Sequence, residues 1–324
     1  MRLPLPHSGV SDTNTEVGMS TTRTVLSGLV TATVLSTVVV AVHATPAQAV
    51  PAPTLCVVPS TGGVARFNLG GSGFTQIRTT ATATVYGGGG YGVVAVNPSV
   101  PEAWLKRPTS STWTMVARPG LPAAWDYQTT DTALYLLLGP SPTQKTVRRY
   151  NGSGSSWTTI SGQFRTMYTG NYGLFARQSS AGDIYRYSGS GSSWSVVGGP
   201  GYSFAVTNTA LYGLNPDRTG IFQYNGSGTA WTNIGGGAWA IYGGGHGLFA
   251  TLKTNGNLFR YLGTPGAWED LGQPPGGIRS ATVTNNAVFA EDATFSRVFL
   301  YEAFDGGGWA TVSTSPVGSM VACP

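Results

Sequence analysis

The chain is poor in the residues on which most enzymes and metal sites depend. Its 324 residues include only 18 Lys or Arg, 13 Asp or Glu, 3 His and 2 Cys. It is also not rich in the Leu, Ala, Glu and Lys that long helices and membrane bundles require, so both classes are disfavoured. What the chain has instead is 47 Gly, 20 Pro and 11% aromatic residues. That many aromatics exclude a disordered chain, and short apolar pieces between turns predict an all-β protein.

The N-terminus carries the pattern of an export signal. Arg23 precedes the apolar run Val25–Val42, and the small residues Ala47 and Ala49 follow as a cleavage site. We expect cleavage after Ala49, so that residues 1–49 form a signal peptide and the protein is secreted to the extracellular space. The run is also long enough to anchor the chain in a bilayer, which is the alternative, but the cleavage site favours removal.

The predicted mature part, residues 50–324, is one domain with a basic balance of charge. Met19 would give a signal of more usual length, so residues 1–18 can be a misplaced start. The mature part keeps a single histidine, His246, and its net charge of +5 invites a nucleic-acid partner. Predicted export and the lack of a Lys/Arg cluster argue against one, and anionic glycans or cell walls fit better. After signal cleavage we expect no stable membrane insertion.

Internal repeats decide the predicted architecture. The clearest unit is an aromatic, a Gly/Ser turn and a Trp seven residues after the aromatic, as in Tyr150 to Trp157 and Tyr187 to Trp194. Seven such marker aromatics recur at intervals of 37 to 44 residues; they are Phe74, Trp113, Trp157, Trp194, Trp231, Trp268 and Trp309. The chain therefore contains seven related units.

Each unit divides into four short strands separated by Gly-rich turns. In residues 237–273 the strands are expected at Ala238–Tyr242, Gly247–Thr251, Asn257–Tyr261 and Ala267–Leu271. Four strands per repeat of about 40 residues are typical of a β-propeller blade. We therefore predict a seven-bladed β-propeller with four-stranded blades, in which the repeated aromatics pack between adjacent blades.

The two ends of the chain are expected to share one blade. Val317–Ala322 resembles a first strand with no blade after it, whereas Leu55–Ile77 supplies three strands and lacks a first one. Pairing them closes the ring and removes the exposed sheet edges. The two mature cysteines lie in these segments, so we predict a Cys56–Cys323 disulfide, which export permits and adjacent strands bring within range.

The aligned units resemble tectonin repeats. The pattern is a small-residue turn, an apolar strand, a strand of Asp/Asn, Ile/Leu, Tyr/Phe and Arg, and a strand that begins with Trp. It is carried by Asp183-Ile-Tyr-Arg-Tyr187 with Trp194 and by Asn257-Leu-Phe-Arg-Tyr261 with Trp268. It covers nearly all of residues 54–324, with Ala81–Gly120 and Leu121–Gly162 departing most. The resemblance implies a lectin for glycans such as bacterial surface sugars or methylated glycans.

Catalytic motifs are lacking. There is no His-Glu-x-x-His, no Gly-x-Ser-x-Gly and no phosphate-loop Lys. Gly87, Gly89 and Gly92 match Gly-x-Gly-x-x-Gly, but no helix is expected after them, so we interpret them as a hairpin turn. His246 by itself cannot form a His-based metal site.

Adjacent carboxylates occur only at Glu269-Asp270 and Glu291-Asp292. Neighbours on a strand point to opposite faces, so neither pair is poised for acid–base chemistry. We predict that the protein is not an enzyme and uses no cofactor and no metal.

Basic residues recur in the predicted third strands, at Arg66, Lys106, Arg149, Arg186 and Arg260. We interpret these five positions as equivalent and place them on the outer part of the propeller. They are solvated or bridge blades in one interpretation. In the other, each offers an Arg beside an aromatic at a binding site between blades.

Aromatic residues outside the marker positions are the other binding candidates. Trp125 and Trp239 lie on or near first strands, and Tyr168, Tyr242 and Tyr86 precede the turn that follows. Each can be core filling or can face a rim where a sugar ring stacks. An apolar floor with a few directed polar groups is what a ligand site requires.

These features predict a secreted, monomeric, non-catalytic carbohydrate-binding protein, a lectin with several similar sites that gain strength from multivalency. Its partner would be a cell-surface or cell-wall glycan. The alternative is a secreted protein-binding propeller, such as an inhibitor or a cell-surface adaptor. A propeller glycosidase is less favoured, because carboxylates from several blades would have to converge at one mouth. The candidate carbohydrate-binding residues are Trp125, Trp239, Tyr168, Tyr242, Tyr86, Arg149, Arg186 and Arg260.

Overall fold

A computed structural model of the chain describes residues 54–68, 73–82, 84–87, 89–97, 99–100, 102–117, 124–141, 143–302 and 307–323. These residues all belong to one compact unit, Ala49–Pro324. Within these ranges the chain forms strands and turns without any helix, so no helix there is able to cross a membrane. The predicted signal peptide, residues 1–49, lies outside the described residues.

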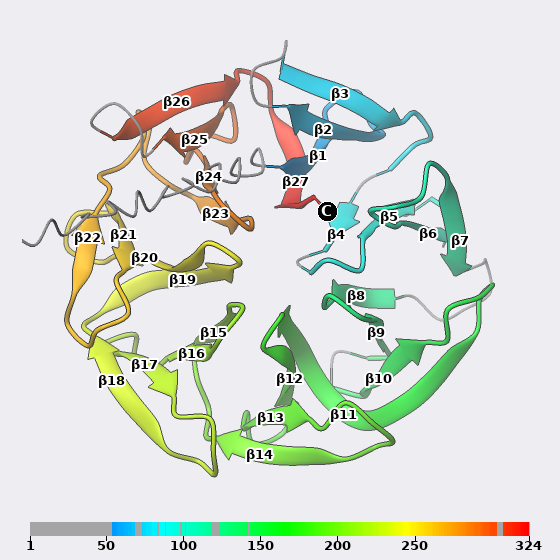
Figure 1. Cartoon of the computed structure of the whole chain (residues 1–324), viewed down its shortest axis with the longest axis horizontal. Coiled ribbons are helices and arrows are strands. Elements are labelled where there is room, and N and C mark those ends of the chain that lie inside the picture. Colours follow the sequence, from blue (N-terminus) through cyan, green and yellow to red (C-terminus); the bar gives the residue numbers. More distant parts are fainter. Residues whose placement is uncertain are drawn as a thin grey trace, which may run out of the picture. The chain divides into compact units, whose positions relative to one another are not determined.

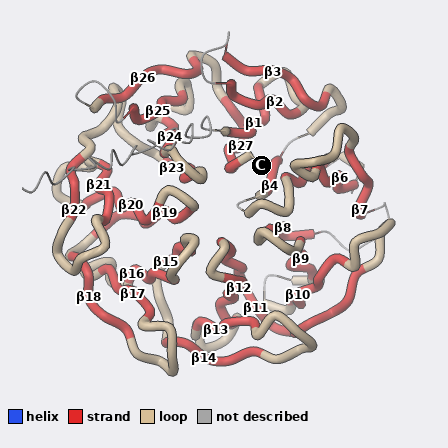
Figure 2. Tube along the Cα trace, in the orientation of Figure 1, coloured by secondary structure: helices blue, strands red, loops and turns tan. Residues whose placement is uncertain are grey.

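Five of the six antiparallel sheets in the described part have four strands each (Figure 2). Their strand orders are β27-β1-β2-β3, β4-β5-β6-β7, β15-β16-β17-β18, β19-β20-β21-β22 and β23-β24-β25-β26. The strands span β27 Val317–Ala322, β1 Leu55–Pro59, β2 Val64–Asn68, β3 Gly73–Arg78, β4 Thr84–Tyr86, β5 Val93–Asn97, β6 Glu102–Lys106, β7 Trp113–Ala117, β15 Ser203–Val206, β16 Leu211–Leu214, β17 Ile221–Tyr224, β18 Trp231–Gly235, β19 Ala238–Gly244, β20 Gly247–Leu252, β21 Leu258–Tyr261, β22 Trp268–Asp270, β23 Ser280–Val283, β24 Val288–Glu291, β25 Val298–Glu302 and β26 Gly308–Ser313.

The sixth sheet has seven strands because one long strand belongs to two blades. Its order is β8 to β14, with bounds β8 Ala124–Thr129, β9 Leu134–Leu138, β10 Lys145–Tyr150, β11 Trp157–Gly170, β12 Gly173–Gln178, β13 Ile184–Tyr187 and β14 Trp194–Gly198. The first half of β11 pairs with β10 and the second half with β12. Between the halves Gln163 has a φ of 62° and the register shifts, which bends the strand from one blade into the next.

With β11 divided between its two halves, the described strands form seven four-stranded units. We number them blade 1 (β27, β1–β3), blade 2 (β4–β7), blade 3 (β8–β10 and the first half of β11), blade 4 (the second half of β11, β12–β14), blade 5 (β15–β18), blade 6 (β19–β22) and blade 7 (β23–β26). The first strand of each blade contacts the first strand of the next, and β23 contacts β27, so the described strands close into a ring (Figure 1). The protein is a β-propeller, as the repeats predict.

The core lies between blades, so that each blade buries its two faces against its neighbours. Each of seven buried clusters draws its side chains from two adjacent blades. Tyr135 of blade 3 meets Tyr187 of blade 4 edge to face at 6.2 Å, and Tyr212 of blade 5 meets Tyr261 of blade 6 at 6.1 Å. The interpretation of the repeated aromatics as blade-to-blade packing is confirmed.

The marker tryptophans tie successive blades together at their outer strands. In each of six blades the indole Nε1 donates to a backbone carbonyl in, or directly after, the last strand of the preceding blade, at 2.8–3.1 Å. The donor–acceptor pairs are Trp113–Ile77, Trp157–Val116, Trp194–Ile160, Trp231–Val197, Trp268–Ile234 and Trp309–Leu271. The acceptor always lies three residues after the marker aromatic of its own strand, so the repeat period itself positions every bond.

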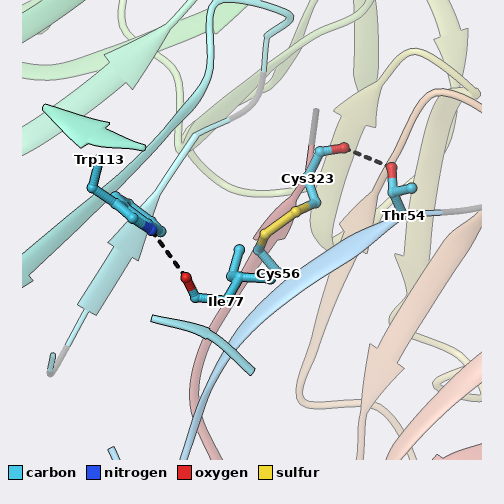
Figure 3. Close-up of a disulfide and its surroundings, with 5 residues drawn as sticks. All are labelled: Thr54, Cys56, Ile77, Trp113 and Cys323. Atoms are coloured by element: carbon cyan, nitrogen blue, oxygen red, sulfur yellow. Dashed lines mark hydrogen bonds between the residues drawn. A yellow bond between two sulfur atoms is a disulfide. The ribbon is translucent and has the colours of Figure 1, made fainter. Parts of the chain in front are cut away.

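Blade 1 is built from both ends of the described chain, as predicted. β27 pairs with β1, which pairs with β2, and Cys56 forms a disulfide with Cys323 (Figure 3). The two Cα atoms are 5.0 Å apart. Thr54 reinforces the closure, because its hydroxyl donates to the Cys323 carbonyl oxygen at 2.6 Å. Both the shared blade and the disulfide prediction are confirmed.

The predicted equivalence of Lys106 with the third-strand arginines is wrong by one residue. Lys106 pairs with Trp113 in the same way that Tyr150 pairs with Trp157, whereas Arg149 pairs with Thr158. Lys106 therefore occupies the position of the repeated Tyr, and its Nζ donates to the Ser110 carbonyl oxygen. The Tyr-to-Trp spacing of seven places it correctly, because Lys106 is itself seven residues before Trp113.

Candidate functional site

The predicted site residues do not converge on one place. Tyr86, Tyr168 and Tyr242 lie in or next to the first strands near the axis, whereas Arg149, Arg186 and Arg260 lie in third strands farther out (Figure 1). Trp239 lies at the beginning of β19. Trp125 lies in β8, and its side chain is outside what the structure describes.

The axial tyrosines are largely engaged in packing. Tyr168 and Tyr242 line an axial channel of about 270 Å³, and Gly87, next to Tyr86, lines it too. The Tyr168 ring packs edge to face on Phe204, and Tyr86 packs on Tyr127. Burial is the largest cause that raises the pKa of the Tyr86, Tyr168 and Tyr242 hydroxyls. Aromatic packing therefore takes up part of the surface of the Tyr86 and Tyr168 rings.

A carboxylate with unusual protonation is hydrogen-bonded to Gln128, which lines the axial channel. Asp126 of β8 accepts a hydrogen bond from Gln128, whose own carbonyl oxygen accepts from Thr169. Burial raises the pKa of Asp126 to about 7, against the opposing effects of the Gln128 hydrogen bond and the Lys145 charge. Among the described residues no group of three His, Cys, Asp or Glu side chains is able to hold a metal ion.

The third-strand arginines have two different environments, because the turn after the first strand alternates around the ring. Blades 2, 4 and 6 place an aromatic side chain in this turn, and blades 3, 5 and 7 place a buried Thr there. Backbone hydrogen bonds join the turns in pairs of adjacent blades: Tyr91 N to Thr130 O at 2.9 Å, Tyr172 N to Thr207 O at 3.2 Å and His246 N to Thr284 O at 2.8 Å. This alternation does not follow from the single-blade repeat of the sequence.

Arg186 and Arg260 belong to the aromatic turns. The Arg186 guanidinium carbon lies 4.4 Å from the centre of the Tyr172 ring, and Nη2 donates to the Tyr172 carbonyl oxygen at 3.2 Å. The equivalent neighbour of Arg260 is His246, whose pKa is lowered by burial first and by the Arg260 charge second. Arg186 is therefore engaged in holding a turn of its own blade, which is a structural use, and Arg260 lies near the equivalent turn of blade 6.

Arg149 is different, because it lines an open cavity between blades 3 and 4. The cavity has a volume of about 410 Å³. Its walls are Arg149, Tyr150, Asn151, Thr158, Thr159 and Ile160 from blade 3, and Tyr187, Gly191 and Ser192 from blade 4. We call this cavity the Arg149 pocket.

Polar groups line part of the Arg149 pocket. Thr158 donates from its hydroxyl to Asn151 Oδ1 at 2.9 Å, and Tyr187 donates from its hydroxyl to the Gly191 carbonyl oxygen at 3.0 Å. Arg149 adds a guanidinium with up to five donors, and no described carboxylate forms an ion pair with it. Hydrogen-bond donors and acceptors thus both line a cavity whose volume falls in the range of small-molecule sites.

Trp239 lies at the end of the blades opposite the Arg149 pocket. The loops at this end join the second strand of a blade to its third strand, and one blade to the next. The Trp239 ring is 50% exposed. The Arg218 guanidinium lies over the Trp239 ring and also over the Tyr202 ring. The sequence interpretation missed both Arg218 and Tyr202. The sequence repeat gives no signal for Arg218: the left-handed residue of the equivalent loops in blades 4 and 6 is Gly182 or Gly256, and in blade 5 it is Arg218, one position earlier in the loop.

Comparisons with known proteins establish the fold and no more. No family model matches the chain. No curated protein matches it either.

Solved structures, β-propellers among them, resemble the structure at low sequence identity. A structure of YCF48 bound to D1 peptide shares 15% identity with a TM-score of 0.50, over 71% of this chain and 82% of that one. The β-propeller domain of the trilobed protease from Pyrococcus furiosus shares 14% with a TM-score of 0.52, over 77% and 86%. The acylaminoacyl peptidase of Pyrococcus horikoshii shares 11% with a TM-score of 0.55, over 76% of this chain and 47% of that one.

Proposed function

We propose that the protein is an exported, non-catalytic carbohydrate-binding protein that holds a sugar in the Arg149 pocket. The observation that carries the proposal is the cavity itself: about 410 Å³ between two blades, with an Arg that no described carboxylate pairs and with hydroxyl and carbonyl groups on its rim. A monosaccharide presents hydroxyls that both donate and accept. Such a rim is able to satisfy both kinds of hydrogen bond, whereas an apolar cavity is not.

The sequence supports the same proposal. The units resemble tectonin repeats, a family of glycan-binding propellers, and the apolar run before Ala49 has the pattern of an export signal. The net charge of +5 favours a glycan that carries carboxylate or sulfate groups. We place the main site at Arg149 rather than at Arg186 or Arg260, because Arg149 lines an open cavity, whereas Arg186 holds the turn at Tyr172.

A glycan array with the purified full-length chain tests the proposal, followed by titration of the best sugar against two variants. Arg149→Ala should weaken binding by at least about tenfold, since it removes a charged hydrogen-bond donor from the pocket. Arg186→Ala is the matched control: it occupies the same strand position one blade later and stacks on Tyr172. It should leave sugar affinity within about twofold.

Absence of binding across a broad bacterial and eukaryotic array would refute the carbohydrate proposal. Equal losses in the two arginine variants would refute the choice of pocket. Capture of a single stoichiometric protein partner, insensitive to free sugar, would favour the protein-binding alternative.

A further inference from the structure

Four side chains on the loops of blades 5 and 6 form a compact patch that the carbohydrate proposal does not use. Tyr202 precedes β15, Arg218 lies between β16 and β17, Trp239 begins β19, and Lys253 lies between β20 and β21. Antiparallel strands place all of these loops at one end of the blades, opposite the turns that border the Arg149 pocket. We call these four residues the Trp239 patch.

Arg218 is the centre of the Trp239 patch. Its guanidinium carbon lies 4.6 Å from the centre of the Tyr202 ring and 4.9 Å from that of the Trp239 ring. Lys253 Nζ lies 5.9 Å from the same Trp239 ring and donates to the Asp217 carbonyl oxygen at 3.1 Å. Tyr202 and Trp239 are each 50% exposed, although large aromatic rings are normally well buried.

The backbone of Arg218 is held in a costly conformation. Its φ is 59°, in the left-handed region where a side chain is disfavoured, whereas Gly182 and Gly256 serve this purpose in the loops of blades 4 and 6. Phe295 of blade 7 is the other described loop residue of this kind, with a φ of 60°. A strained Arg stacked on two exposed rings is the kind of outlier that points to a functional contact.

The arrangement favours an anionic ligand over an uncharged sugar ring. A sugar stacks its C–H face on a free aromatic face, but in the Trp239 patch the cations lie over those faces. An Arg held by its flat sides still presents its N–H edges, and these bind carboxylates bidentately. Within the described residues only Arg279–Glu291 and Arg297–Asp292 form ion pairs, so no carboxylate of the described part neutralises Arg218 or Lys253.

We propose that the Trp239 patch binds an acidic segment of a partner protein. Trp, Tyr and Arg are the residues most enriched at the energetic centres of protein interfaces. Here the exposed rings of Tyr202 and Trp239 occur together with the half-buried, positively charged Arg218. Charge complementarity selects a segment rich in Asp and Glu. This proposal does not depend on sugar binding at the Arg149 pocket, which lies at the other end of the blades.

The test measures fluorescence anisotropy of labelled 12-residue peptides, one rich in Glu and Asp with a central Tyr, and one with Gln and Asn in their place. The acidic peptide should bind the full-length protein at least about tenfold more tightly than the neutral one. Arg218→Lys should weaken binding of the acidic peptide by about tenfold as well. An ammonium keeps the charge but loses the planar stack and the fork of donors. Non-specific attraction to a basic surface would survive that substitution.

Two glycine variants separate binding from folding. Arg218→Gly should abolish peptide binding while raising the melting temperature, since glycine tolerates the left-handed backbone. Phe295→Gly makes the same backbone exchange in blade 7 and should leave peptide affinity unchanged. Retention of full affinity by Arg218→Lys and Arg218→Gly would overturn the proposal.

A third arm distinguishes the source of the carboxylates. Polygalacturonate should bind less tightly per carboxylate than the acidic peptide, because it lacks side chains that pack beside Trp239 and Tyr202. Preferential binding of polygalacturonate, lost in Trp239→Ala, would assign the patch to an acidic glycan instead and contradict a protein partner.

Discussion

The indole Nε1 of Trp231 donates a hydrogen bond to the carbonyl oxygen of Val197 across the boundary between blades 5 and 4, at 2.8 Å. Gly198 follows Val197, and a Cβ at Gly198 would lie 2.7 Å from that nitrogen, so the indole needs a glycine there. The same donor recurs in six blades. In blade 1 the marker position is Phe74, which has no N–H to donate. The ring is therefore tied differently at the one place where the two chain ends meet.

Replacing Trp231 by Phe should lower the free energy of unfolding by about 1–3 kcal/mol. The indole donor is lost and the carbonyl of Val197, a buried residue, keeps no partner. Urea unfolding monitored by circular dichroism measures the change. Trp239→Phe is the control, because that ring is half exposed, and it should change stability by less than about 0.5 kcal/mol. Equal effects would contradict a structural role for the inter-blade bond.

Phe74→Trp should add the missing bond between blades 7 and 1. At the other boundaries the acceptor lies three residues after the marker aromatic of the preceding blade. Here that aromatic is Trp309, so the expected acceptor is the carbonyl oxygen of Val312. We expect a gain of up to about 1 kcal/mol in the free energy of unfolding, the usual net value of a new hydrogen bond. Phe74→Tyr, which adds a polar atom without the indole geometry, should give no such gain. A loss with Phe74→Trp would mean that the space beside β3 is too small.

Removal of the disulfide should destabilise the protein strongly. Cys56 and Cys323 are 267 residues apart in sequence, and the chain-entropy argument assigns about 5 kcal/mol to a loop of that length. The double variant Cys56→Ala with Cys323→Ala should therefore melt at a much lower temperature in scanning calorimetry. Adding reductant should lower the melting temperature of the native protein and leave that of the variant unchanged.

Asp126→Asn should alter how stability depends on pH. Burial raises the folded-state pKa of Asp126 from 3.8 to about 7, so the folded protein binds a proton that the unfolded chain releases. The native protein should therefore lose stability as pH rises from about 4 to 7, by roughly 2–4 kcal/mol relative to the Asn variant, and stay level above that. Urea unfolding at several pH values measures the free energy of unfolding of both proteins. If the pKa of Asp126 were the same in the folded and unfolded states, the two plots of this free energy against pH would run parallel, which would contradict the prediction.

Asp292 should act in the opposite direction and at lower pH. Burial tends to raise the pKa of its carboxyl, but hydrogen bonds from Ser296, Arg297 and Thr294 outweigh it and lower the pKa well below the usual range. Its contribution to stability is thus present above about pH 4 and is lost as the pH falls further. Asp292→Asn should be less stable near neutrality and should lack this acid-side decline, as measured by the same titrations.

Much of the architecture could be predicted because the repeat is visible in single residues. A Trp seven residues after a Tyr indicates a third strand, a turn and a fourth strand, and it placed the blade boundaries to within a few residues. It could not predict that β11 runs unbroken through two blades, because a bulge at Gln163 leaves no mark in the Gly/Ser pattern. The misplacement of Lys106 is a different case, because its spacing of seven from Trp113 does place it with the repeated Tyr; an error of one position matters because alternate residues of a strand face opposite blades.

The sequence by itself determined the local elements, the ring closure and the disulfide, because turns, strand period and cysteine placement are properties of short segments. The tertiary structure alone decided what each recurring side chain does. Arg149 and Arg186 hold equivalent positions, yet one lines a pocket and the other stacks on Tyr172, because the first turn of blade 4 carries Tyr172 where that of blade 3 carries Thr130. Binding sites on a propeller are made where two or more loops meet, and the distances between loops are set by how whole blades pack.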